Sequence, residues 1–108
     1  MIKGVKICGI SDITTLTHIL DHDFPPKFIG FICDYKKSKR YVSYERLKTL
    51  LNVDRKNTNF VSVLVNPENE VLERMKKLNF DFLQLYNVEP KKTKMIKEKY
   101  GIKIITAL

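Results

Sequence analysis

Short apolar runs alternate along the chain with segments in which apolar residues recur at helical spacing. The runs have the length of buried strands and are rich in Val, Ile, Leu and Phe. They occupy residues 5–8, 28–33, 60–65, 81–86 and 102–107. The helical segments lie between them, at about residues 13–20, 44–51, 67–78 and 90–100. Because strands and helices alternate, the chain is predicted to form a parallel sheet with right-handed crossovers.

Capping and turn residues give the boundaries of these elements. The signals are Ser11-Asp12 and Ser43 as helix caps, Asn66-Pro67-Glu68 and Pro90 as helix starts, and Gly101 as a helix end. Residues 34–42 are predicted to form a long basic loop. Cys8 ends the first strand, directly before Gly9, which permits a sharp turn. A thiol is therefore expected at the sheet edge where ligands bind in α/β proteins, although a small buried side chain also explains a cysteine there.

Length and composition restrict the class of protein. The chain has 108 residues, which is one domain, whereas an eight-stranded barrel typically needs ~250. No apolar run approaches the ~20 residues that span a bilayer, and Met1 begins no signal-peptide pattern. Cys8 and Cys33 do not suggest a disulfide framework, so a cytoplasmic protein is expected. The net charge of +8 would attract anions, but most of the lysines are expected on solvated helix faces.

Four stretches carry a resemblance to a known family. Lys6-Ile7-Cys8-Gly9-Ile10-Ser11 resembles the opening of the phosphoribosylanthranilate isomerases, TIM-barrel enzymes of tryptophan biosynthesis. Gly30-Phe31, the basic stretch 36–43 and the stretch 83–89 follow in the order that this family requires. The resemblance implies half of a (β/α)8 barrel over residues 1–108, with about four βα units and a fifth strand. A flavodoxin-like open sheet with helices on both faces remains the alternative.

The resemblance implies an Amadori rearrangement of an aminoaldose to an aminoketose, without a cofactor or a metal ion. Cys8 matches the cysteine that acts as the family's base, and a free thiol titrates near ~8.5, so it needs positive neighbours. Lys6 lies on the same face of the strand and either supplies that charge or fills the bottom of the site. Arg40 matches the arginine that binds the anthranilate carboxylate, with an exposed basic side chain as its alternative. Gln84 is expected to point into the site.

Other family features are missing from the chain. The family's general-acid aspartate lies on the sixth strand and its phosphate cradle on the last two loops, beyond the part that this chain matches. The glutamine of the family is usually followed by leucine, histidine and glycine, whereas Tyr86 and Asn87 hold the last two places here. Two classes therefore remain open. One is an isomerase that needs a second half-barrel; the other is a non-catalytic truncated homologue or a module that binds anionic ligands.

An open half-barrel would leave an apolar face and two strand edges uncovered, which are association sites. A homodimer or a complementing half-barrel is therefore the expected partner, and the expected substrate is a small phosphorylated aromatic-amine sugar. Neither a membrane nor a nucleic acid is expected to bind, although tyrosines alternate with lysines in residues 35–44. His18 and His22 have a metal-binding spacing, but without a third ligand they are interpreted as a surface pair.

Overall fold

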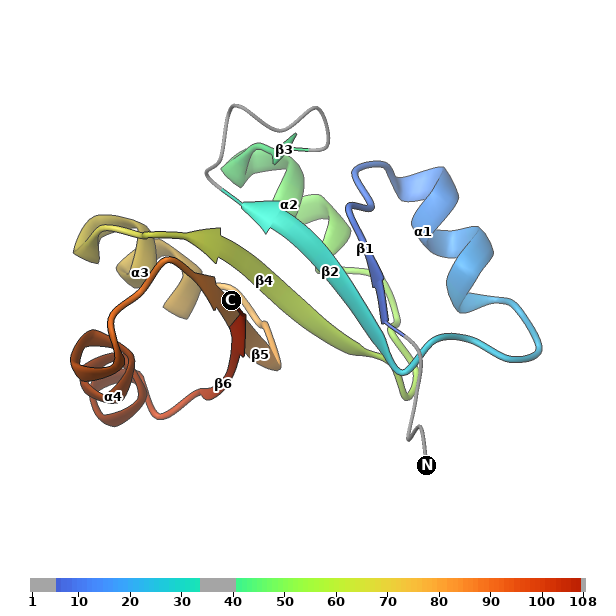
Figure 1. Ribbon diagram of the computed structural model, residues 1–108. Coiled ribbons are helices and arrows are strands. Elements are labelled where there is room, and N and C mark those ends of the chain that lie inside the picture. Colours follow the sequence, from blue (N-terminus) through green and yellow to red (C-terminus); the bar gives the residue numbers. More distant parts are fainter. Residues whose placement is uncertain (1–5, 34–40, 108) are drawn as a thin grey trace.

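The computed structural model describes residues 6–33 and 41–107 (Figure 1). The strands are β1 (Lys6–Cys8), β2 (Phe28–Cys33), β3 (Tyr41–Val42), β4 (Asn59–Val65), β5 (Phe82–Tyr86) and β6 (Lys103–Ala107). The helices are α1 (Ile13–Leu20), α2 (Tyr44–Leu50), α3 (Asn69–Lys76) and α4 (Pro90–Tyr100). This is the alternation of strands and helices that the apolar pattern predicts. None of the helices in the described ranges is long and apolar enough to cross a membrane.

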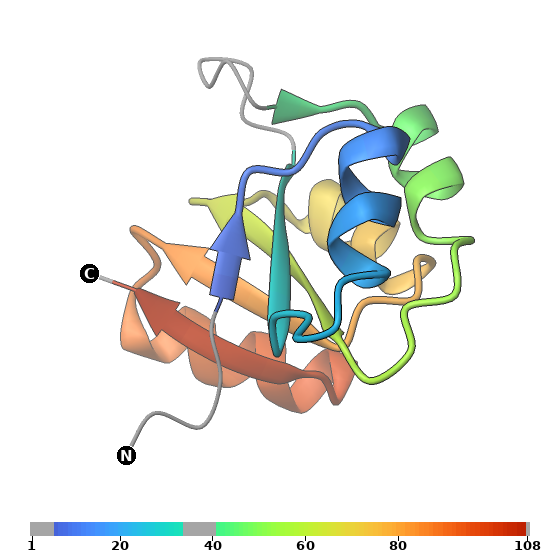
Figure 2. The same cartoon turned by 90° about the vertical axis from the view of Figure 1, so that its right-hand side faces the viewer.

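The strands are parallel and follow one another in chain order. The order is β1-β2-β4-β5-β6, with the short β3 paired to β2. The arrowheads of β1, β5 and β6 accordingly point to the same end of the sheet (Figure 2). A flavodoxin-like sheet requires a reversal of strand order near its centre. The open-sheet alternative is therefore wrong, and the half-barrel interpretation is confirmed.

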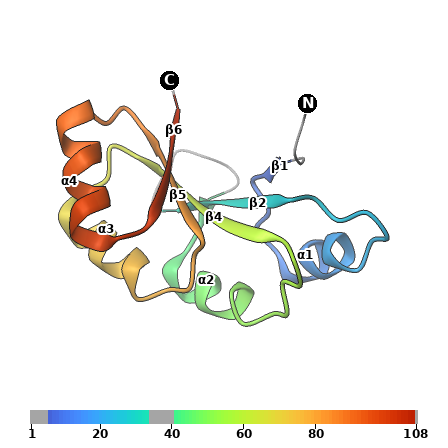
Figure 3. The ribbon, with the colours of Figure 1, turned by 90° about the horizontal axis from the view of Figure 1, so that it is seen from below.

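The described helices all lie on one side of a curved sheet (Figure 3). Side chains alternate between the two faces of a strand, so every second residue packs under the helices. On that convex face, Phe31 is fully buried with its ring centroid 5.1 Å from that of Phe60 and 6.2 Å from that of Phe80. The helices add Leu16, Leu20, Leu47, Leu50, Val71, Leu72, Met75 and Ile96 to this core.

The opposite face is concave. Phe28 of β2 and Phe82 of β5 both project from it, and their ring centroids lie 5.5 Å apart. These two strands are separated by β4, so on a flat sheet they would be ~10 Å apart. The rings meet because the sheet curls inward, as it does in a barrel wall.

Two local predictions are wrong. Residues 34–42 were predicted as a loop, but Tyr41 and Val42 pair in parallel with Ile32 and Cys33 as strand β3. Asn66 was predicted to start a helix, yet its φ is 41° and α3 begins at Asn69. Both errors arise from backbone pairing with another segment, which leaves no local sequence signal. Tyr41 and Val42 pair with β2, and the Asn66 backbone N–H donates to Tyr86 O of β5 at 2.8 Å.

The cap of α1 is confirmed at Asp12. Its carboxylate accepts hydrogen bonds from the Thr15 backbone N–H at 2.8 Å and from the Thr15 hydroxyl at 2.9 Å. These bonds lower the pKa of Asp12 below its usual 3.8, and the backbone bond has the largest effect. The nearby charge of Arg46 makes a smaller contribution to the pKa in the same direction.

We expect the Asp12 charge to stabilise the fold only above acidic pH. A lowered pKa in the folded state gives a contribution that is complete above the unfolded pKa and is lost as the pH falls through the folded one. Asp12→Asn keeps the cap without the charge. Urea unfolding should therefore show the wild type to be more stable at pH 7, with the gap closing as the pH falls below 3.8. A gap that does not change with pH would contradict this.

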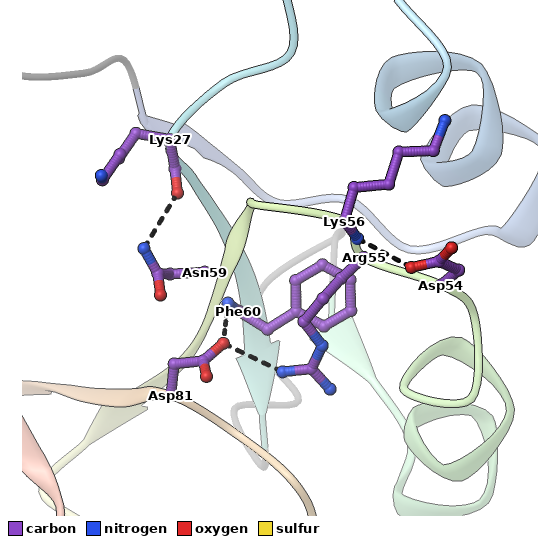
Figure 4. Close-up of polar contacts among 7 residues, drawn as sticks. All are labelled: Lys27, Asp54, Arg55, Lys56, Asn59, Phe60 and Asp81. Atoms are coloured by element: carbon purple, nitrogen blue, oxygen red, sulfur yellow. Dashed lines mark hydrogen bonds and ion pairs between the residues drawn. The ribbon is translucent and has the colours of Figure 1, made fainter.

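An ion pair joins the amino-terminal ends of β4 and β5 (Figure 4). Asp81 Oδ2 accepts from Arg55 Nη1 at 2.9 Å and from the Phe60 backbone N–H at 2.8 Å. The Asp81 N–H in turn donates to Phe60 O at 2.9 Å, and the Arg55 guanidinium lies 4.2 Å from the centroid of the Phe60 ring. Asp81 is therefore a structural residue at the end of the sheet that lies opposite Cys8.

Asp81→Ala is expected to lower the free energy of unfolding by about 2 kcal/mol, because two donors lose their acceptor. Asp81→Asn keeps one acceptor oxygen but not the charge, so about half that loss is expected. Asp23→Ala removes an exposed carboxylate outside this network and serves as the control. Urea unfolding followed by circular dichroism measures all three. Equal stability of Asp81→Ala and Asp23→Ala would show that the network contributes nothing.

Candidate functional site

Cys8 is the last residue of β1, and its side chain is exposed at the carboxyl-terminal end of the strand. Gly9 follows with a φ of 87°, a region that glycine enters without strain, and its N–H donates to Gly30 O at 2.9 Å. The chain therefore turns at once toward α1. The expected sharp turn after the thiol is present.

Lys6 and Cys8 lie side by side on the concave face, against Gly30 of β2. A β-carbon placed on Gly30 would be 3.1 Å from Lys6 Nζ, 3.2 Å from Cys8 Sγ and 3.2 Å from Val63 Cγ2. The missing side chain of Gly30 thus provides the space that the thiol and the ammonium group occupy. Any larger residue at position 30 would force both groups to move.

Gln84 lies on the same face two strands further on. Val63 of β4, which borders Gly30, is also the register partner of Gln84 in β5. The Gln84 side-chain amide donates from Nε2 to the Tyr86 hydroxyl oxygen at 3.1 Å. Gln84 is only 8% exposed, and its Oε1 has no hydrogen-bond partner among the described residues. A continuous row of side chains therefore runs from the thiol to this amide.

Other candidate residues are not part of this row. Arg40 lies outside the described residues. Asp12 caps α1 and Asp81 belongs to the opposite edge, so neither carboxylate is directed at Cys8. His18 is exposed on α1 and His22 is exposed in the turn after it, and within the described ranges no group of three or more potential ligands forms a metal site. The concave face thus presents a thiol, an ammonium group and an amide, but no acid from the described part of the chain.

Comparison with known proteins agrees with the half-barrel fold. The sequence profile of N-(5'-phosphoribosyl)anthranilate (PRA) isomerase matches residues 5–108. The chain belongs to this family. An N-(5'-phosphoribosyl)anthranilate isomerase of Listeria monocytogenes (serotype 4a, strain HCC23) is 35% identical over 89 residues, which are 82% of this chain and 42% of that protein.

Two solved structures show the same fold. A phosphoribosylanthranilate isomerase in complex with reduced 1-(o-carboxyphenylamino)-1-deoxyribulose 5-phosphate matches with a TM-score of 0.84 and 27% identity. It aligns with 96% of this chain and 52% of its own. Monomers made from the dimeric isomerase of Thermotoga maritima match with a TM-score of 0.80 and 28% identity, over 96% and 51% of the two chains. This chain therefore spans about half the length of the family members that it matches.

The departure of this chain from the family at Asn87 has a backbone explanation. Asn87 has a φ of 55°, in the left-handed region that glycine and asparagine tolerate best. Asparagine at the place where the family usually has glycine thus keeps the turn after β5. The departure at Tyr86 places a phenol on the concave face beside Gln84, within the candidate site.

Asn87→Ala is expected to lower the free energy of unfolding by about 1 kcal/mol, because an alanine side chain is strained at this φ. Asn87→Gly restores the usual residue of the family and should be at least as stable as the wild type. Thermal and urea unfolding of both variants check the prediction. Equal losses for alanine and glycine would mean that the asparagine side chain matters, and not the backbone conformation.

Sequence reasoning missed one residue of the candidate site. Gly30 was used only as part of a motif, although it makes room for Lys6 and Cys8. Tyr86 was expected on the same face as Gln84, because the two residues are two positions apart in a strand. The hydrogen bond between their side chains was not foreseen.

Proposed function

We propose that the chain is the amino-terminal half of a catalyst for the isomerisation of N-(5'-phosphoribosyl)anthranilate, the Amadori rearrangement that its family name denotes. The observation that carries the proposal is the exposed Cys8 thiol at the carboxyl-terminal edge of a half-barrel. The thiol lies beside Lys6 and next to Gly30, whose lack of a side chain leaves room for both groups. In barrel enzymes this edge holds the reacting groups. The cytoplasm, where a thiol stays reduced, is the proposed location.

Cys8 is proposed as the general base. After the furanose ring opens to a Schiff base, the thiolate takes the proton from the neighbouring sugar carbon, and the electron pair of that bond moves toward the nitrogen to give the enolamine. Lys6 is proposed to support the thiolate and to attract the anionic substrate, because its ammonium group lies on the same side of Gly30.

The remaining contacts are proposed from the family. Arg40 is assigned to the anthranilate carboxylate, which a guanidinium binds through two parallel hydrogen bonds. Gln84 is assigned to substrate binding, and its buried free oxygen supports this role. The acid that protonates the ring oxygen and the phosphate site are proposed to come from a second half-barrel.

A second half-barrel is also the proposed partner. Phe28, Ile32, Val65, Phe82 and Ile105 are only half-buried on the concave face, which the sheet turns away from its helices. Burial of this apolar surface is worth ~25 cal/mol per Å². The partner is proposed to be either a complementing carboxyl-terminal half or a second copy of the chain. Sedimentation equilibrium at micromolar concentration tests the second copy, and a clean monomer would exclude it.

One reconstitution experiment tests the proposed function. The chain is assayed alone and after assembly with the half of the Listeria isomerase that it does not match. We expect no more than trace turnover alone and a measurable rate after assembly. Robust turnover by the chain alone would reveal an acid outside the described residues. Failure after verified assembly would contradict the proposal.

Failure would favour a module that binds anionic ligands without turnover. Lys6 and Lys103 support this second candidate, since both project from the concave face and neither forms an ion pair with a described carboxylate. Anion binding that persists in a Cys8→Ala variant, with no activity in any assembly, would establish it.

A further inference from the structure

Gln84 and Tyr86 form a pair with unused hydrogen-bonding capacity on the concave face. Because Gln84 Nε2 donates to the Tyr86 oxygen at 3.1 Å, the phenolic hydrogen of Tyr86 is free to be donated elsewhere. No described residue accepts it. The Gln84 Oε1 is buried and also lacks a partner. The pair thus offers one hydrogen-bond donor, the Tyr86 hydroxyl, and one acceptor, Gln84 Oε1, on side chains that contact each other.

A buried acceptor without a partner is costly, typically by 1–3 kcal/mol, so a ligand that satisfies it gains affinity. Carboxylate and phosphate groups carry acceptors only and would face Gln84 Oε1 with like partial charge. A hydroxyl group can donate to Oε1 and accept from Tyr86 at the same time. The chemistry of the pair therefore selects a hydroxyl and disfavours an anion.

The position of the pair fits the middle of a substrate. Three strand spacings separate β1 from β5, or ~14 Å along the sheet, and the curvature shortens the path between side chains. A ligand that contacts both Cys8 and Gln84 must therefore be larger than a single functional group. We propose that Gln84 and Tyr86 hold a hydroxyl group of the ribosyl part of the substrate, and that Tyr86 thereby sets specificity for a hydroxylated sugar. This inference rests on the proposed function for the identity of the substrate.

Two probes test the pair without turnover. Ribose 5-phosphate carries hydroxyl groups and an anion, whereas sulfate is an anion without a hydroxyl. Each is titrated into the chain, and binding is followed by the amide chemical shifts of residues in β4 and β5. Tyr86→Phe should weaken ribose 5-phosphate binding about tenfold and leave sulfate binding unchanged. Tyr100→Phe is the matched control, because its hydroxyl donates to Glu73 at 2.8 Å on the far surface, and it should change neither affinity.

A second variant separates binding from structure. Gln84→Leu removes the buried oxygen that has no partner, so resistance to urea should be unchanged or higher while the affinity for ribose 5-phosphate falls about tenfold. A purely structural role would lower the stability instead. The inference is overturned if the wild type fails to bind ribose 5-phosphate, if Tyr86→Phe does not weaken its binding, or if sulfate binding falls equally. Because no outcome depends on catalysis, a failed reconstitution of the isomerase is a separate result.

Discussion

Replacement of Cys8 by alanine is expected to reduce the turnover of the assembled barrel by at least a hundredfold, since a general base typically contributes ~10²–10⁴-fold. The fold should be unaffected, because the thiol is exposed and packs into no core. The measurement is the isomerisation rate of wild type and variant after assembly with the same carboxyl-terminal half. Unfolding in urea verifies that both chains are equally stable.

Cys33→Ala provides the matched control for this prediction. Cys33 lies on the convex face of β2, where its thiol contacts Phe31 O at 3.2 Å and the Ser62 hydroxyl at 3.3 Å. Its loss should lower stability but leave the rate of the folded enzyme unchanged. Wild-type turnover by Cys8→Ala, or equal loss of turnover by both variants, would contradict the assignment of Cys8 as the base.

Phe31→Ala is expected to cost about 3–5 kcal/mol of unfolding free energy, the usual cost of emptying a fully buried aromatic site. Small domains have a total stability of only about 5–15 kcal/mol, so this variant should be marginally folded. Phe31 has this effect because it joins the aromatic rings of β4 and of the segment before β5. Urea unfolding followed by circular dichroism measures the loss.

Phe24→Ala is the control for this second prediction. Phe24 is 87% exposed in the turn after α1, so its removal should change the stability by less than about 0.5 kcal/mol. A loss for Phe31→Ala no larger than that for Phe24→Ala would show that the convex core is not packed around Phe31.

The sequence alone determined the parts of this protein that depend on neighbours along the chain. Helical spacing of apolar residues located α1 to α4, and Pro90 and Gly101 bounded α4 as predicted. Ser43 and Asp12 cap their helices through bonds to residues three positions away. These signals are readable because each is an interaction within a few residues, and the Cys8-Gly9 motif is of the same kind.

The tertiary structure decided everything that depends on which distant segments meet. The apolar runs of β2 and β4 fit a half-barrel and an open sheet equally well, because both folds bury the strands. Only the packing of all helices on one face produced the curvature that brings Phe28 and Phe82 together. The pairing of β1 with β2 places Lys6 and Cys8 beside Gly30, and packing on the concave face leaves Gln84 with a buried, unpaired oxygen. Such contacts join residues far apart in the chain, so their geometry follows from packing and not from local sequence.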